Sequence, residues 1–202
     1  MKKLLLSLIL LFVSDWTHGK SVLVLGDSIS AAYGLEKLDY GWVAMLQEKL
    51  KSRGLAVVNA SISGETSAGG LYRIDELLRR NAPSVVILEL GANDGLRGLS
   101  LKVLESNLDQ MINRAKAHGA EVLLLGMRIP PNYGRYAEQF QKVFPQLAER
   151  QQIPYVPFLM DGIGGHSEMM QADGLHPNRD AQVVIFGFVW EKLEPMLGNP
   201  NR

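Results

Sequence analysis

The stretch SVLVLGDSIS, residues 21–30, decides the fold class of this chain. Its first six residues form a short apolar run ending in Gly26, as buried parallel strands commonly do. Asp27 and Ser28 follow at once, so polar groups come where the strand should end. Similar runs recur along the chain and alternate with segments of helical periodicity. This alternation predicts βαβ units with right-handed crossovers.

The whole pattern predicts one three-layer α/β/α domain with a five-stranded parallel sheet. A chain of 202 residues with 47% hydrophobic residues suits one such core. The expected strands are residues 21–26, 55–60, 85–90, 122–126 and 155–158. The expected helices are residues 42–51, 71–80, 101–118, 136–151 and 181–197. Pro145 is expected to interrupt the fourth helix, because proline removes a helical hydrogen bond.

The N-terminal segment has the pattern of a secretory signal peptide. Lys2 and Lys3 precede the apolar run 4–13, and a short polar stretch leads to Gly19. We expect cleavage after Gly19, which leaves residues 20–202 as the mature domain in the periplasm or outside the cell. A membrane anchor is the alternative, although this run is far shorter than the ~20 residues that span a bilayer. No cysteine is present, so neither a disulfide nor an acylated N-terminal cysteine is expected.

The charge balance argues against a nucleic-acid partner. Lys and Arg number 21, as do Asp and Glu, so the formal net charge is zero. A nucleic-acid-binding chain usually carries a basic excess. We expect no nucleic-acid partner, no stable membrane anchor after processing, and a monomer.

Four polar segments lie where a parallel sheet collects functional groups. Gly26-Asp27-Ser28, Ser63-Gly64 and Asn93-Asp94 follow the first three strands, and Asp173-Gly174-Leu175-His176 precedes the last helix. Ligands of open α/β sheets bind beyond the carboxyl ends of the strands, so these segments are expected to converge there.

The residue types in these segments are those that acyl transfer needs. A serine hydroxyl becomes a good nucleophile when an imidazole takes its proton, and a carboxylate orients that imidazole. Ser28, His176 and Asp173 supply these groups. The Ser28 N–H, the Gly64 N–H and the Asn93 side-chain amide could stabilise the oxyanion of the tetrahedral intermediate. Asp27 and Asp94 are expected to be structural.

These four segments resemble, in order, the motifs of the SGNH/GDSL hydrolase family, and the resemblance covers essentially the whole mature domain. The strings NASISGETS, ELGANDGLRG and DGLHPNRDAQ are similar to its multifunctional periplasmic esterases, which act as thioesterases, lysophospholipases and arylesterases. Ile29 stands where the family name implies leucine. The resemblance implies strand order 2-1-3-4-5, as in flavodoxin, and no metal or organic cofactor. It also implies hydrolysis of fatty acyl esters and thioesters, so we expect a small-molecule acyl ester or thioester substrate.

Several alternatives compete with this assignment. Asp161 and His166 form a second potential acid–base pair, and His118 is expected to be structural at a helix end. Neither a nucleotide-binding G-x-G-x-x-G nor the G-x-S-x-G of α/β-hydrolases occurs, and no spacing is typical of a zinc site. A carbohydrate O-deacetylase and a non-catalytic binding protein of the same fold remain open.

Two loops are expected to bind the acyl chain. Gly95 and Gly98 predict a loop over residues 95–100, and residues 127–134 follow the fourth strand at the same sheet edge. The candidate substrate-binding residues are Leu96, Arg97, Leu99, Ile129, Pro130 and Tyr133. The alternative is ordinary loop packing.

Overall fold

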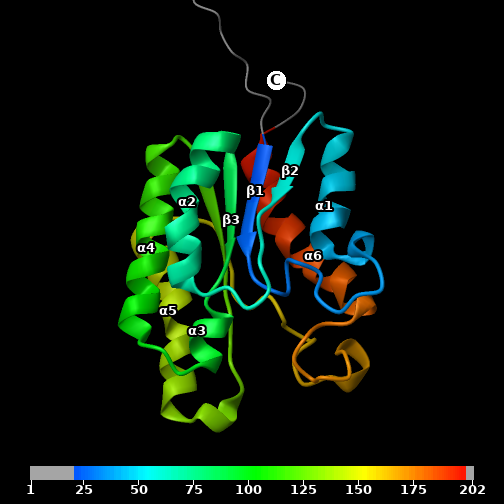
Figure 1. Ribbon diagram of the computed structural model, residues 1–202, viewed down its shortest axis with the longest axis vertical. Helices are drawn as coiled ribbons and strands as arrows, with labels where there is room; N and C mark the ends of the chain where they lie inside the picture. The colour runs from blue at the N-terminus through cyan, green and yellow to red at the C-terminus, as the bar shows by residue number, and fades with distance from the viewer. Residues whose placement is uncertain (1–20, 199–202) are drawn as a thin grey trace, which may run out of the picture.

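A parallel five-stranded sheet forms the middle layer of the fold (Figure 1). The computed structural model describes residues 21–198. Its strands are β1 (Ser21–Gly26), β2 (Ala56–Asn59), β3 (Val85–Glu89), β4 (Glu121–Leu125) and β5 (Tyr155–Val156). Their order is β2-β1-β3-β4-β5 and every pairing is parallel, so the predicted fold class is confirmed.

Helices cover both faces of the sheet (Figure 1). One face carries α1 (Trp42–Lys51) and α6 (Arg179–Leu193), and the other carries α2 (Ser67–Asn81), α4 (Leu101–Ala117) and α5 (Arg135–Gln151). The short helix α3 (Ala92–Leu96) follows β3 at the lower edge of the sheet in this view. The described residues also contain 3-10 turns at Leu38–Tyr40, Pro131–Tyr133, Ser167–Met169 and Glu194–Leu197.

The central strands are apolar because both of their faces are covered. Every residue of β1 and β3 is buried, whereas the edge strand β2 is partly exposed. Burying one large aliphatic side chain contributes about 1.5–3 kcal/mol, so the buried residues of these strands stabilise the fold strongly. The sheet also makes a rigid support for the loops that leave the strands.

The helix over residues 71–80 begins earlier than predicted, at Ser67. The Thr66 Oγ1 accepts a hydrogen bond from the Gly69 N–H, and Asp94 accepts another from the Ser67 N–H. These acceptors satisfy N–H groups that a helix start leaves free. Gly69 and Gly70 have low helix propensity, so the sequence pattern did not predict the first turn of this helix.

Two further expectations about the helices were wrong. Helix α5 runs through Pro145 without interruption, because the buried side chains of Phe140, Phe144 and Leu147 hold it against the sheet. The expected loop at Gly95 begins instead as helix α3, in which the Gly95 N–H donates to the Gly91 carbonyl oxygen.

The N-terminal prediction is not tested by the structure. The expected signal peptide, residues 1–19, lies outside the described residues. Within residues 21–198, no helix is long and apolar enough to cross a membrane.

Candidate active site

The turn after β1 presents Ser28 at the carboxyl edge of the sheet. The Ala31 N–H donates to the Asp27 carbonyl oxygen over 2.9 Å, and the Tyr33 N–H donates to the Ser28 carbonyl oxygen over 3.1 Å. The Asp27 side chain closes the turn, because its Oδ1 accepts from the Ile29 N–H over 3.1 Å. These bonds fix the backbone on both sides of the Ser28 hydroxyl.

A second loop brings the imidazole to the same edge. Asp173 Oδ1 accepts from the Leu175 and His176 N–H groups over 2.9 and 3.0 Å, which bends the loop back on itself. Gln171 ties this loop to the first turn, since its side-chain amide donates to the Tyr33 carbonyl oxygen over 2.8 Å. The loop then enters α6, where the Asn178 side chain caps the helix.

The hydroxyl, imidazole and carboxylate form a continuous chain of hydrogen bonds. Ser28 Oγ lies 2.9 Å from His176 Nε2, and His176 Nδ1 lies 2.6 Å from Asp173 Oδ2. The Tyr33 ring packs against the imidazole with its centroid 4.7 Å away. In this geometry the carboxylate can hold a proton on Nδ1, which leaves Nε2 to accept the hydroxyl proton.

The residues of the three candidate oxyanion donors, Ser28, Gly64 and Asn93, line one cavity of about 300 Å³ together with His176. Among the described residues, none accepts a hydrogen bond from the N–H of Ser28 or of Gly64. Asn93 Nδ2 donates to Asp27 Oδ2 over 3.0 Å, and its second hydrogen remains available. Gly64 has φ of +80°, a conformation that favours glycine.

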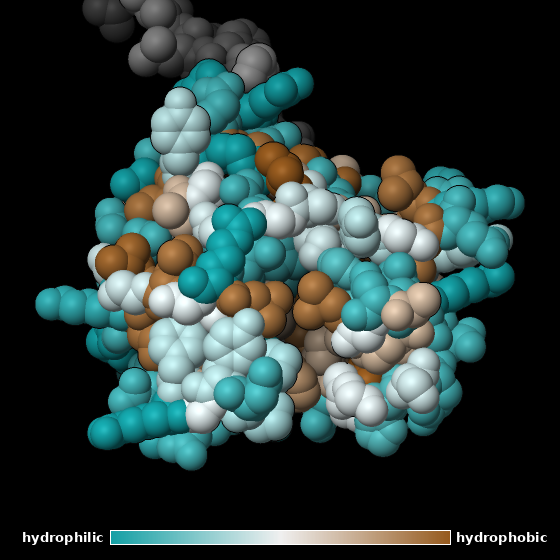
Figure 2. Space-filling model, turned by 60° about the horizontal axis from the view of Figure 1, so that its bottom comes forward, coloured by the Kyte–Doolittle hydropathy of each residue, from teal (hydrophilic) through white to brown (hydrophobic). Residues whose placement is uncertain are grey.

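A larger apolar cavity opens from this one. Its volume is about 430 Å³, and both cavities share Ile29, Ala92, Leu96 and Leu175 as lining residues. Figure 2 turns this edge of the molecule toward the viewer and shows apolar residues gathered around a hollow in the middle of the face. The other apolar residues that line the larger cavity include Met127, Ile129, Pro130, Phe158, Met160 and Met170. This larger cavity, called the apolar groove below, therefore adjoins the cavity that holds the Ser28 hydroxyl.

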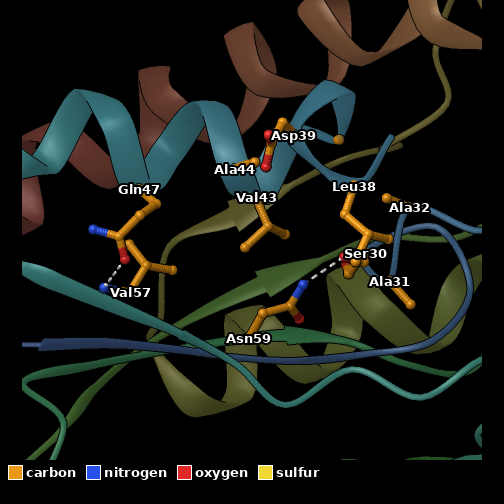
Figure 3. Close-up of a pocket in the computed structure, with 11 residues that line it drawn as sticks. Ser30, Ala31, Ala32, Leu38, Asp39, Val43, Ala44, Gln47, Val57 and Asn59 are labelled. Atoms are coloured by element: carbon orange, nitrogen blue, oxygen red, sulfur yellow. Dashed lines mark hydrogen bonds between the residues drawn. The ribbon is translucent and has the colours of Figure 1, made fainter. Parts of the chain in front are cut away.

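A third cavity, of about 230 Å³, lies on the α1 side of the turn and is lined by Ser30, Ala31 and Ala32 (Figure 3). There the Asn59 side-chain amide donates to the Ser30 carbonyl oxygen over 2.8 Å. Gln47 Oε1 accepts from the Val57 N–H and so joins α1 to β2. The Asn59 bond braces the turn that carries Ser28 from the side away from the groove.

Comparison with known proteins identifies the family. The sequence profile of the GDSL-like Lipase/Acylhydrolase family matches residues 24–183, which is most of the chain. The chain belongs to the GDSL-like lipase/acylhydrolase family.

Individual relatives of this GDSL-like chain agree with that result. It is 49% identical to esterase TesA of Pseudomonas aeruginosa over 98% of the chain and 100% of the relative. It is 43% identical to thioesterase 1/protease 1/lysophospholipase L1 of Escherichia coli over 90% of the chain and 86% of the relative. A crystal structure of TesA superposes with a TM-score of 0.84 and 50% identity, over 88% and 99% of the two chains. The prediction of an ester-hydrolysing serine hydrolase is thereby confirmed.

Hydrogen bonds stabilise the ionised form of Asp173 in this GDSL-like site. The His176 N–H, the His176 side chain and the Leu175 N–H lower the pKa of Asp173 from 3.8 to about 2. Asp173 therefore carries a negative charge at neutral pH, as a carboxylate that orients an imidazole must.

A pair of buried carboxyl groups, Asp27 and Glu89, lies at the turn that carries Ser28 in this GDSL-like fold. Burial raises the pKa of Asp27 to about 6, although the Ile29 N–H, the charge of His176 and the Asn93 side chain lower it in part. Burial and the neighbouring Asp27 charge raise the pKa of Glu89 well above its ordinary value. Glu89 was not predicted from the sequence, because it ends a strand and precedes the obvious Asn93 segment.

The candidate substrate residues fall into two groups. Leu96, Ile129 and Pro130 line the apolar groove. Arg97, Leu99 and Tyr133 lie outside the lining of both cavities and hold the loop after α3. Arg97 donates to the Gly64 carbonyl oxygen and Tyr133 to the Leu96 carbonyl oxygen, each over 2.9 Å. The Leu99 carbonyl oxygen accepts from the Tyr136 hydroxyl over 2.6 Å.

Other groove residues were not found from the sequence. Ile29 and Leu175 directly adjoin Ser28 and His176, so their positions in the chain were a usable signal. Met127 lies in the loop over residues 127–134 that was expected to bind the acyl chain, although it was not singled out, and Phe158 lies in an expected strand and gave no signal of its own.

The remaining polar groups stay apart from this site. His166 lies at the surface, with its Nδ1 3.4 Å from Glu168 Oε1. His118 Nδ1 forms a hydrogen bond with the Arg114 carbonyl oxygen at the end of α4. Asp94 accepts from the Ser67 N–H and hydroxyl, and so ties α3 to α2. Within residues 21–198, no three His, Asp or Glu side chains gather as metal ligands would.

Proposed function

We propose that this chain hydrolyses fatty acyl esters and thioesters through an acyl-enzyme on Ser28. One observation supports it most: the hydrogen-bonded Ser28, His176 and Asp173 lie at the mouth of an apolar groove. The groove is large and apolar enough to remove an acyl chain from water, which is the main source of binding energy for such a chain.

The proposed mechanism uses each of these groups once per half-reaction. His176 Nε2 accepts the Ser28 proton while Ser28 Oγ attacks the acyl carbonyl carbon. The N–H groups of Ser28 and Gly64 and the Asn93 amide stabilise the oxyanion. The alcohol or thiol then leaves with the proton from His176. Water repeats the same steps and releases the carboxylic acid and the free hydroxyl.

The names of the relatives support the same substrate class. The Pseudomonas aeruginosa relative is named an esterase, and the Escherichia coli relative is named a thioesterase and lysophospholipase. A carbohydrate O-deacetylase needs room for a sugar but little apolar groove beyond the acetyl group. The groove therefore favours long acyl chains over acetylated sugars.

A chain-length series tests the proposal. The purified protein is given aryl esters, acyl thioesters and lysophospholipids of increasing chain length, with acetylated sugars in a parallel series. We expect kcat/KM to rise from acetyl to medium-length chains and to fall to background in Ser28→Ala. A preference for acetylated sugars would support the O-deacetylase, and no turnover of any substrate would support a binding protein.

The location of the enzyme is a separate proposal. Residues 1–19 have the composition of a signal peptide, so we propose that the mature enzyme begins at Lys20 in the periplasm or outside the cell. N-terminal sequencing of the protein from a periplasmic extract and from the medium tests both the cleavage site and the compartment.

A further inference from the structure

A fully buried carboxyl group lies against the turn that carries Ser28. Glu89 ends β3 and has no exposed surface. Its Oε2 accepts from the Asp27 N–H over 3.0 Å and from the Ser30 hydroxyl over 2.6 Å. One oxygen atom of Glu89 therefore holds the turn on both sides of Ser28, and the proposed mechanism gives this residue no task.

The neighbouring Asp27 makes a different set of bonds. Its Oδ1 accepts from the Ile29 N–H and its Oδ2 accepts from the Asn93 amide. Only 1% of Asp27 is exposed. Because both oxygens accept from N–H groups, the ionised form of Asp27 fits its surroundings. That form also fixes one hydrogen of the Asn93 amide and directs the other toward the cavity.

Asp27 and Glu89 are buried next to each other, since the Asp27 N–H donates to Glu89 Oε2. Two neighbouring buried carboxyl groups are unfavourable when both are ionised. Burial and the Asp27 charge raise the pKa of Glu89, whereas hydrogen bonds and the charge of His176 favour the anion at Asp27. Among the described residues, none forms a hydrogen bond with Glu89 Oε1, although that atom is buried. An ionised oxygen in such a place costs far more than a neutral one.

We propose that Glu89 is a positioning residue that stays neutral at physiological pH, holds the Asp27–Ser28 turn and leaves the charge of the pair on Asp27. Asp27 in turn orients the Asn93 amide toward the oxyanion. Asn59 still holds the Ser30 carbonyl oxygen from the other side (Figure 3), so loss of Glu89 loosens the turn without removing all of its support.

The charge state is tested by stability, which does not depend on the proposed function. A folded-state pKa raised above the ordinary 4.5 means that the folded protein keeps a proton that the unfolded chain releases. Stability from this proton is complete at low pH and is lost as the pH rises. Glu89→Gln has no such proton, so wild type should become progressively less stable than Glu89→Gln with rising pH.

Urea unfolding is measured for both proteins between about pH 6.5 and about pH 8, where Asp27 is largely ionised. The ratio of their unfolding constants should change by up to about tenfold per pH unit. Glu121→Gln is the matched control, because Glu121 is an exposed residue at the start of β4. The ratio of its unfolding constant to that of wild type should stay constant over this pH range. A constant ratio for Glu89→Gln as well would mean that Glu89 is ionised and would overturn the proposal.

The positioning role rests on the proposed function and is tested by kinetics. The Gln amide oxygen can accept the same two hydrogen bonds, so Glu89→Gln should keep kcat within about fivefold of wild type. Glu89→Ala removes the acceptor and should lower kcat by about 100-fold, with KM changed far less, because the oxyanion donor and nucleophile lose their alignment. Equal losses in the two variants, or full activity in Glu89→Ala, would contradict the role. If wild type has no esterase activity, the proposed function fails while the stability result still stands.

Discussion

Arg97 donates a hydrogen bond to the Gly64 carbonyl oxygen over 2.9 Å and thereby joins the loops that follow α3 and β2. These loops adjoin two of the candidate oxyanion donors, Asn93 and Gly64. The sequence placed Arg97 among the substrate-binding residues, but its side chain lies outside the groove. Its contact indicates that it holds the Gly64 peptide in the positive-φ conformation.

Arg97→Ala should therefore lower kcat for a short ester by about three- to tenfold. The loss is smaller than the 10²–10³ typical of deleting an oxyanion donor, because the Gly64 N–H remains and only its orientation relaxes. Steady-state kinetics on an acetyl aryl ester measures it. Arg80→Ala, on an exposed residue of the last turn of α2, is the matched control. An unchanged kcat for the short ester together with an altered chain-length preference would contradict this prediction and show that Arg97 acts in substrate binding.

Two tyrosines hold the groove side of the same loop. The hydroxyls of Tyr133 and Tyr136 donate to the Leu96 and Leu99 carbonyl oxygens. The Tyr133→Phe, Tyr136→Phe double variant removes both bonds and keeps the rings. KM for long acyl esters should rise several-fold because Leu96 lines the groove, while kcat for acetyl esters should change little. Equal effects on long and short substrates would show that the loop does not set chain-length preference.

The contact between α3 and α5 leaves no room for a methyl group at Gly95. A Cβ there would lie 2.6 Å from Phe140 Cε2 and 2.7 Å from Ile129 Cγ2. Gly95→Ala should destabilise the protein by about 1–3 kcal/mol, as overpacking does. Gly187, within α6, has open space where a methyl group would stand, so Gly187→Ala should stabilise by about 0.5–1 kcal/mol. Urea unfolding separates the two, and similar effects of both variants would contradict this packing argument.

The low pKa of Asp173 predicts how stability responds to acid. Because the folded-state pKa is about 2 and the ordinary value is 3.8, the stabilisation is complete above pH 3.8 and is lost as the pH falls toward 2. Asp173→Asn should therefore flatten the acid dependence of unfolding in this window. The size is modest, since the Asp173 side chain is 42% exposed and solvent screens the interaction. An unchanged slope across this acid window would mean that the bonds to His176 and Leu175 do not persist in solution.

The same variant should lower kcat by roughly 10⁴-fold at neutral pH, because Asn cannot hold the imidazole in the required tautomer. Steady-state kinetics on an aryl ester measures the loss, and a kcat close to that of wild type would contradict the role of Asp173.

Much of this architecture is legible in the chain because local pattern and global fold agree. The runs at β1 and β3 are almost wholly apolar, as strands of a parallel sheet covered on both faces are. Ser28 could be predicted because it follows the clear strand β1, and His176 because it comes shortly before the last helix, α6. These features predicted the parallel sheet and the candidate residues at its edge, whereas the strand order was implied by the family resemblance alone.

What escaped prediction depends on contacts between distant segments. The Asp94 side chain accepts a hydrogen bond from the Ser67 N–H and helps to start α2 a full turn earlier than predicted. No residue near Ser67 in the sequence indicates that bond. Packing of Phe140 and Phe144 overrides the disruptive tendency of Pro145. Glu89 is polar in an otherwise apolar strand, but its partners Asp27 and Ser30 lie about 60 positions earlier in the chain.

The central claim is that Ser28 is a nucleophile activated by His176. A fluorophosphonate probe labels such a hydroxyl covalently, and intact-protein mass spectrometry with peptide mapping locates the adduct. We expect one adduct per chain on Ser28, no adduct in Ser28→Ala, and labelling slowed by at least about 100-fold in His176→Ala. An adduct on another residue, or equally fast labelling of folded His176→Ala, would contradict the account.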